Sequence, residues 1–293
     1  VLAVLGLGIW AVLSAGAEEL PGELPPLPDL DRAHPQLARQ LREVDNRARS
    51  GEEIQASLGR LARMYHANGY LNEAIRVYDL LLQVEPEEPR WPHLLAFILA
   101  GYGRLEVSLP LWERVIELDP DYLPARFRLA DALLKLNRFE EAREVYNQVR
   151  DRDLDNPYAF VGLARLAMND GDLRKARGYL LDAAGNSDNR IGIDLLVTVF
   201  EQLGEVDKAA YLRGQQKAKG SYTDMVDPWL QDLMDVCYDP YQLVTAGGFA
   251  AFSGDLERGI GILRRALLYE PGHAIANFQI AGMYAQSGDD AKA

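Results

Sequence analysis

The sequence predicts an all-α fold, an α-α superhelix in which antiparallel helix pairs stack in line as a solenoid. Two recurrences lead to this prediction. Pro86 and Pro120 lie 34 residues apart, and each follows an apolar segment that ends in an acidic residue. Small residues recur at the same interval: Ala74, Ser108, Ala142 and Ala176. A chain that repeats at this period is one supersecondary unit copied in line, and each copy buries its apolar face against the next.

The first helix of each unit has a pattern of large and small residues. The repeats cover residues 55–88, 89–122, 123–156 and 157–190, a fifth begins near 190, a sixth covers 240–273, and a seventh begins at 274. Position seven is mostly large and position eight mostly small, as in Leu61-Ala62 and Leu129-Ala130. Position eleven, such as Tyr65, is mostly bulky again. This spacing places the residues on one helical face, and the small residue lets two helix backbones approach closely.

A turn and a second helix complete each unit. Glycines suited to a left-handed helix end are Gly69, Gly171, Gly204 and Gly254. An acidic residue such as Asp172 or Asp255 then begins the second helix, where a carboxylate suits the positive end of the helix dipole. Bulk follows four residues after the small position, at Tyr78, Trp112, Tyr146 and Leu180. Proline ends the unit because it cannot continue a helix.

These residues resemble the tetratricopeptide repeat family over about residues 55–223 and 240–293, and the chain is similar to its exported bacterial members. The resemblance implies that positions two, five, nine, twelve and thirteen of each first helix face a concave surface. There are departures: the aromatic residue often found at position four is Leu58 in the first repeat and Arg126 in the third. Gly59 and Arg63 also stand where the carboxylate-clamp variant needs lysine and asparagine. Capture of a free chain terminus by that route is therefore not expected.

The inward-facing positions define a candidate partner-binding groove. Its residues are Arg63, His66, Arg90, His93, Phe97, Phe127, Asp131, Tyr158, Arg165, Met168, Phe252 and Phe278. Aromatic side chains beside arginines on a rigid wall are the composition of interaction hot spots. We expect the arginines to bind acidic or carbonyl groups and the rings to anchor apolar side chains. The alternative is that several of these rings pack between neighbouring repeats.

Composition limits the classes of function. The net charge is −13 and the isoelectric point about 4.8, which argues against binding nucleic acid or an anionic membrane surface. The single cysteine, Cys237, lies in an apolar-periodic stretch and is expected to be a buried small hydrophobe. The four histidines form no ligand pair, and no phosphate-binding loop or nucleophile elbow occurs in the sequence. We therefore expect no metal, no cofactor and no enzymatic activity.

The N-terminal region differs from the repeats. Residues 1–17 have an apolar core that ends in Ala15-Gly16-Ala17, small residues at the spacing of a signal-peptidase site. A cleaved signal peptide, an uncleaved membrane anchor and a structural helix stay open as readings. The first two place the protein outside the cytoplasm, in the periplasm or anchored to the membrane. Because the chain begins with Val1 and lacks a charged leader, we expect that a few residues precede it.

Three further segments complete the organisation. Residues 18–34 read as a Pro-rich linker and residues 35–54 as an N-terminal helix. Residues 224–239 interrupt the array between a block of five repeats and the last two, and Asp227-Pro228 is a helix-start signal there. This insertion is predicted to be an extra helix that packs into the array or, alternatively, a hinge. The seventh repeat stops just inside its second helix, so we expect that the natural protein continues.

The function predicted from these features is that of a non-catalytic scaffold that binds a peptide or a partner helix in its concave groove. The alternative is a regulatory or positioning region of a larger exported enzyme or electron carrier whose active domain follows the array. Self-association of the stack, end to end, is a third option.

Overall fold

The structure is a computed structural model that describes residues 20, 22–186, 190–216, 225–252 and 254–287. Throughout these ranges every regular element is a helix and none is a strand, so the predicted all-α fold built from helix pairs is confirmed. Residues 1–17, which were predicted to be a signal peptide or an anchor, lie outside the described residues. Within the described ranges, no helix combines the length and apolar character needed to cross a bilayer.

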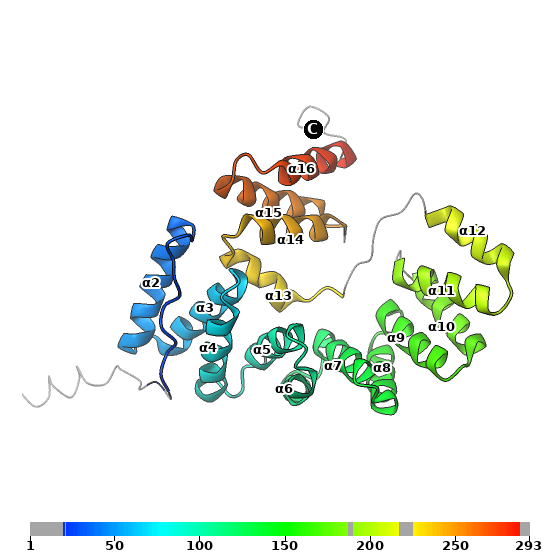
Figure 1. Cartoon of the computed structure of the whole chain (residues 1–293). Helices are drawn as coiled ribbons and strands as arrows, with labels where there is room; N and C mark the ends of the chain where they lie inside the picture. The colour runs from blue at the N-terminus through cyan, green and yellow to red at the C-terminus, as the bar shows by residue number, and fades with distance from the viewer. Residues whose placement is uncertain (1–19, 21, 187–189, 217–224, 253, 288–293) are drawn as a thin grey trace, which may run out of the picture. The chain divides into compact units, whose positions relative to one another are not determined.

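The helices follow the predicted pairing. Before the insertion they are α2 (Pro35–Ser50), α3 (Ile54–Ala67), α4 (Leu71–Val84), α5 (Arg90–Gly101), α6 (Leu105–Leu118), α7 (Leu123–Lys135), α8 (Phe139–Arg152), α9 (Pro157–Asn169), α10 (Leu173–Asn186), α11 (Arg190–Gln202) and α12 (Val206–Gln216). The later elements are α13 (Pro228–Asp232), the 3₁₀ turn η1 (Leu233–Val236), α14 (Pro240–Phe252), α15 (Leu256–Tyr269) and α16 (Ala274–Ser287). Figure 1 shows α6 to α12 following one another in chain order.

The chain forms two compact units. In its described part, unit 1 contains the residues up to Leu95, Trp229–Ala251 and the residues from Asp255 onward. Unit 2 contains the residues from Ala96 to Pro228, together with Phe252 and Gly254. The first repeat therefore belongs to the same unit as α14–α16, although more than a hundred residues separate them in the sequence.

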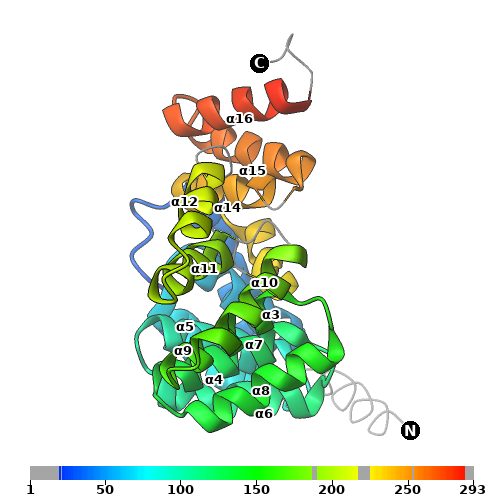
Figure 2. The ribbon, with the colours of Figure 1, turned by 90° about the vertical axis from the view of Figure 1, so that its right-hand side faces the viewer.

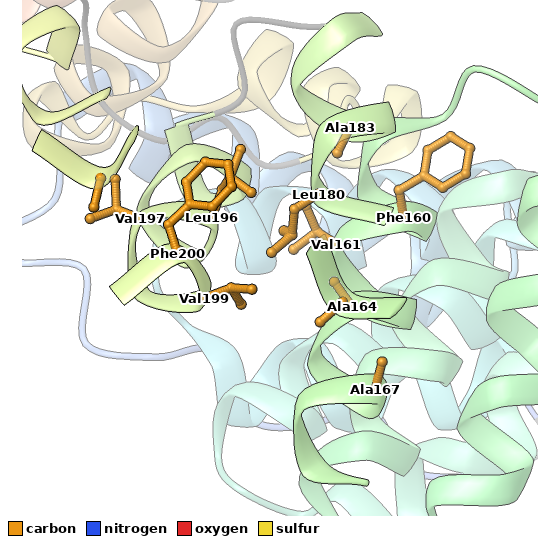
Figure 3. Packing of buried hydrophobic residues seen from close by; sticks show 12 residues of the cluster. Phe160, Val161, Ala164, Ala167, Leu180, Ala183, Leu196, Val197, Val199 and Phe200 are labelled. Atoms are coloured by element: carbon orange, nitrogen blue, oxygen red, sulfur yellow. The ribbon is translucent and has the colours of Figure 1, made fainter. Parts of the chain in front are cut away.

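The predicted repeat pattern forms the core. The small residues at position eight are fully buried: Ala62, Ala96, Ala130 and Ala164. The bulky residues of the second helices are buried as well: Tyr78, Trp112, Tyr146 and Leu180. In unit 2, side chains from α9, α10, α11 and α12 form one continuous apolar cluster, in which Val161, Leu180 and Leu196 represent the first three helices (Figure 3). Each helix thus buries its apolar face against its neighbours in the chain, as a linear repeat array requires.

Left-handed residues end the first helices, as predicted. Gly69, Gly171, Gly204 and Gly254 have φ values between 76° and 94°. The third repeat has no glycine at this place, and Asn137 takes the left-handed conformation instead with φ 59°, as asparagine can. The expected carboxylate caps also form: Asp172 and Asp255 each accept a hydrogen bond of 3.0 Å from the backbone N–H three residues later.

In unit 1, α14, α15 and α16 lie in successive layers (Figures 1 and 2). Glycine permits the close approach of α14 and α15, because a Cβ added at Gly259 would lie 2.8 Å from the carbonyl oxygen of Gly247. Part of the predicted linker also packs in this unit. Leu24 and Leu30 are buried, and Arg49 of α2 donates a 2.7 Å hydrogen bond to the carbonyl oxygen of Pro25.

The insertion begins as a helix at Pro228, but the α-helical part is only five residues long. It tightens into η1, and the backbone is extended at Cys237, with φ −85° and ψ 134°. The side chains of Leu233 and Cys237 are buried. The segment therefore presents its backbone as well as its side chains to the helices around it.

Two side chains from distant repeats hold this backbone. The Asn68 amide bonds at both ends: Nδ2 donates to the carbonyl oxygen of Val236 at 2.9 Å, and Oδ1 accepts from the N–H of Tyr238 at 2.7 Å. The Arg265 guanidinium donates to the carbonyl oxygens of Met234 and Cys237, at 2.6 and 2.9 Å. These bonds dock residues 234–238 in unit 1 by their main chain, independently of their side-chain identities.

Candidate functional site

The candidate groove residues divide between the two units. Arg63, His66, Arg90, His93 and Phe278 belong to unit 1, and the remaining residues belong to unit 2. Phe252 and Phe278 are exposed, with 41% and 81% of their surface accessible.

The two histidines are part of the packing of unit 1. His66 lies with its Nδ1 3.2 Å from the hydroxyl of Tyr78. Burial, and secondarily the nearby His93, lowers the pKa of His66 to about 3, so its ring is neutral near pH 7. His93 is fully buried and meets the ring of Trp229 edge to face at 5.4 Å. The insertion thus covers one of the predicted groove residues of this unit.

The two candidate groove arginines of unit 1 have partners close to them in the sequence. Arg90 forms a two-pronged ion pair with Glu88, whose carboxylate lies 2.8 Å from its Nε, and it rests over the Trp91 ring at 5.2 Å. The hydrogen bond from Arg90 lowers the pKa of Glu88. Arg63 donates a longer bond of 3.4 Å from Nε to the carbonyl oxygen of Gly59, within α3. Both guanidinium groups are partly exposed.

The groove residues of unit 2 come together as a connected row. Arg128 of α7 lies over two rings, at 5.3 Å from Phe97 of α5 and 5.9 Å from Phe127. Phe127 in turn meets Tyr158 of α9 edge to face at 5.6 Å. Phe127 is only 7% exposed and also contacts Tyr146, so it packs between repeats, whereas Phe97 and Tyr158 keep part of their surface accessible.

A charged cluster continues this row. The Asp131 carboxylate lies 2.6 Å from Lys135 Nζ and 3.6 Å from Arg165 Nη1. Its side chain is 18% exposed, whereas that of Lys135 is 60% exposed. Met168 lies one turn beyond Arg165 and packs against the core cluster of unit 2. Asp131 therefore joins the first helices of two successive repeats through its cationic neighbours.

A cavity of about 200 Å³ opens beside these residues. Its lining includes Phe97, Trp112, Arg128, Asp131 and Lys135. Aromatic walls and two cationic groups thus converge on a hollow between α5, α6 and α7. A second hollow of about 370 Å³, lined mainly by apolar side chains that include Leu196, Phe200 and Tyr211, lies between α10, α11 and α12.

Arg128 lies beside the candidate groove residues although it was not predicted to be one of them. It stands at position six of the third repeat, next to the large-small pair that faces the core, and was assigned to no inward-facing position. An arginine at a position where the preceding repeat has the buried Leu94 was the signal that could have revealed it. Arg126, which was noted only as a departure from the repeat pattern, is buried and donates 3.2 and 3.0 Å hydrogen bonds to the carbonyl oxygen of Pro120.

Groups suited to metal or thiol chemistry are not assembled in the described ranges. These ranges contain no group of three or more His, Cys, Asp or Glu side chains placed to hold a metal ion. Cys237 is a buried free thiol, and burial raises its pKa to about 11. A thiol with a raised pKa is a poor nucleophile near neutral pH.

Comparisons with known proteins agree with the repeat pattern. Two tetratricopeptide repeat family models match residues 57–90 and 99–160. The TPR repeat-containing protein YpiA of Bacillus subtilis is 22% identical over 237 residues, which are 79% of this chain and 53% of that protein. The peroxisomal targeting signal receptor of Candida glabrata is 27% identical over 115 residues, 39% of this chain and 19% of the receptor. The chain thus spans about half, or less, of the length of these relatives.

A solved structure supports the fold. The crystal structure of a tetratricopeptide repeat protein from Parabacteroides merdae is similar with a TM-score of 0.51 and 13% identity, over 85% of this chain and 99% of that chain. At this identity the likeness concerns the fold alone. The family models thus identify tetratricopeptide repeats within residues 57–90 and 99–160, and the similarity to YpiA extends over 79% of the chain.

Proposed function

We propose that this protein is a binding scaffold and that unit 2 holds an extended peptide or a partner helix along the row formed by Phe97, Arg128, Tyr158, Asp131 and Arg165, the unit 2 groove. The single observation that carries the proposal is this row. Three consecutive first helices contribute to it, and three of its residues, Phe97, Arg128 and Asp131, line one cavity. Hot spots of protein interfaces have this composition, with aromatic anchors and arginines on a preformed surface.

The parts of the groove have distinct tasks in this proposal. Phe97 and Tyr158 offer partly exposed ring surface for apolar side chains of the partner. The Asp131–Arg165 pair fixes the groove wall and presents a guanidinium with 35% of its side chain accessible. Phe127 is a core residue that packs against the ring of Tyr158. One relative is named as a receptor for a targeting signal, which supports a binding role for repeats of this kind.

The experiment begins by selecting ligands with the full chain. Random peptides displayed on phage are selected on the immobilised protein, and selected peptides are synthesised with a fluorescent label. Their affinities are then measured by fluorescence anisotropy for the wild type and for a Phe97→Ala, Tyr158→Ala variant. We expect the double variant to lose about 2–4 kcal/mol of binding free energy, because truncating two aromatic anchors typically costs that much.

The control variant is Tyr102→Ala. Tyr102 is also an exposed aromatic residue of unit 2, at 52%, but it follows α5 in the turn. Its removal should leave the affinity unchanged, and circular dichroism should show all variants folded. Failure to select any peptide, or equal affinity of the wild type and the folded double variant, would overturn the proposal.

A further inference from the structure

The first and second helices of the early repeats differ in charge. The first helices α3, α5, α7 and α9 together carry seven Arg and Lys residues and one carboxylate, Asp131. The second helices α4, α6 and α8 carry nine carboxylates and five arginines, whereas α10 carries three cations and one carboxylate. The whole chain has a net charge of −13, so the net charge of these first helices is opposite in sign to that of the chain. Such an arrangement gives one surface a potential opposite in sign to that of the whole molecule.

Not every cation of unit 2 can meet a ligand. The Arg126 guanidinium donates hydrogen bonds inside the protein, to the carbonyl oxygen of Pro120 and, at 2.8 Å, to Oε1 of Gln148. Lys135 and Arg165 share the single carboxylate of Asp131, which leaves one positive charge in excess in that cluster. Arg128 lies at the same cavity, above the ring of Phe97. The unit 2 groove is therefore locally cationic.

We propose that the partner of this groove is an acidic peptide segment, in which carboxylates flank a large apolar side chain. This inference rests on the proposed function and specifies its ligand. The apolar side chain enters the cavity between Phe97 and Trp112, whose volume of about 200 Å³ is below the range of sites for drug-sized molecules and suits one side chain. The flanking carboxylates meet Arg128, Lys135 and Arg165 at its rim. Opposite charge across the interface attracts the acidic segment and disfavours basic ones.

A cationic surface could also attract the phosphates of a nucleic acid. The observations favour a peptide, because nucleic-acid binding normally uses a strongly basic domain and many phosphate contacts. Here only two cations of the described residues, Arg128 and Lys135, line a cavity that one side chain would fill, in a chain of isoelectric point about 4.8. A single-stranded oligonucleotide is therefore included as a competing probe.

The test uses the full chain and three matched fluorescein-labelled peptides. In the first, pairs of glutamates flank one phenylalanine; in the others, glutamines or lysines replace the glutamates. We expect the glutamate peptide to bind about tenfold more tightly than the glutamine peptide, since two or three exposed ion pairs contribute about 0.2–1 kcal/mol each. This advantage should shrink as salt is added, because exposed charges are screened. The lysine peptide should bind most weakly.

The variants separate the groove from the overall charge. Lys135→Gln with Arg165→Gln removes two cations beside Asp131 and should abolish the preference for glutamate, so that the ratio of the glutamate-peptide affinity to the glutamine-peptide affinity falls to about one. Arg174→Gln with Lys175→Gln removes the same charge from exposed positions of α10 and should leave the preference intact. Circular dichroism confirms that both double variants are folded.

Three results would overturn the inference: equal affinity for the three peptides, equal loss in both double variants, or tighter binding of the oligonucleotide than of the glutamate peptide. Failure of the acidic-peptide inference can be distinguished from failure of the proposed binding function. If displayed peptides bind in a manner that depends on Phe97 and Tyr158 but are neutral or basic, only the acidic preference is wrong. If no peptide binds at all, both proposals fail.

Discussion

The distance between paired helices is set by single residues. Gly162 of α9 faces Tyr146 of α8, and a Cβ added at Gly162 would lie 2.3 Å from the tyrosine ring. Real Cβ atoms do not approach another atom so closely, and the ring is fully buried with no room to retreat. Glycine is therefore required here by packing, even though it is a poor helix former.

The substitution Gly162→Ala should destabilise the protein. Overpacking of a core typically costs about 1–3 kcal/mol, and the better helix propensity of alanine offsets up to about 1 kcal/mol of this. Urea denaturation followed by circular dichroism measures the net change in the free energy of unfolding.

Gly178→Ala is the matched control for this prediction. Gly178 lies within α10, and a Cβ added there meets no heavy atom of the described residues within 4 Å. Only the propensity gain remains, so this variant should be more stable by about 0.5–1 kcal/mol. A destabilisation equal to that of Gly162→Ala would show that the Tyr146 contact is not the cause.

At the scale of single residues the sequence predicted the core well, whereas the groove stays a prediction whose side-chain contacts only the structure supplies. Tyr78, Trp112 and Tyr146 are buried as expected, because burial follows directly from apolar periodicity. Arg128 was missed, because its role depends on which rings of other helices lie beneath its guanidinium. Phe127 was placed among the groove residues, and only its contacts with Tyr146 and Tyr158 show that it packs between repeats.

Among the elements, the insertion is the one whose structure the sequence could not specify. Its helix-start signal is real, since α13 begins at Pro228, but no local pattern announces the 3₁₀ turn that follows. The bonds that fix residues 234–238 come from Asn68, which is 168 or more residues away, and from Arg265. Side-chain bonds to a backbone leave no signature in the bound segment, because any residue has the same main chain.

The Asn68 clamp can be tested through the only cysteine of the chain. Cys237 lies between the two backbone groups that Asn68 binds, and burial raises its pKa to about 11. In the native state its alkylation by iodoacetamide at pH 8 should therefore be slow. Asn68→Ala removes two hydrogen bonds to partly buried groups, worth about 0.5–1.5 kcal/mol each. The segment should then open more often, and alkylation should accelerate about fivefold to a hundredfold.

Gln83→Ala is the control for this clamp experiment. Gln83 is an exposed residue of α4, in the same unit, and its amide bonds only to the carbonyl oxygen of Asp79 in its own helix. Its removal should leave the alkylation rate as in the wild type. Unchanged alkylation in Asn68→Ala, with the fully unfolded protein reacting rapidly, would show that other contacts hold the segment.

Over the whole molecule, the repeats determine how far a local perturbation spreads. The apolar faces of α7 to α12 are buried mainly against helices that are near neighbours in the chain. Stability in such an array is approximately a sum of terms for each repeat and for each interface between neighbours. A defect in one interface should therefore weaken the adjacent helices and fade within a repeat or two.

Native-state hydrogen exchange of Gly162→Ala tests this expectation. The strained contact lies between α8 and α9, so amide exchange should accelerate in α8, α9 and the adjoining α10. The helices α3, α15 and α16 should keep their wild-type exchange rates, because they belong to unit 1 and the strained contact lies in unit 2. Each unit is compact and can open locally by itself, so a defect in unit 2 need not raise amide exchange in unit 1. A uniform acceleration across both units would instead mean that the chain unfolds as one cooperative block, and an additive description of the repeats would then be wrong.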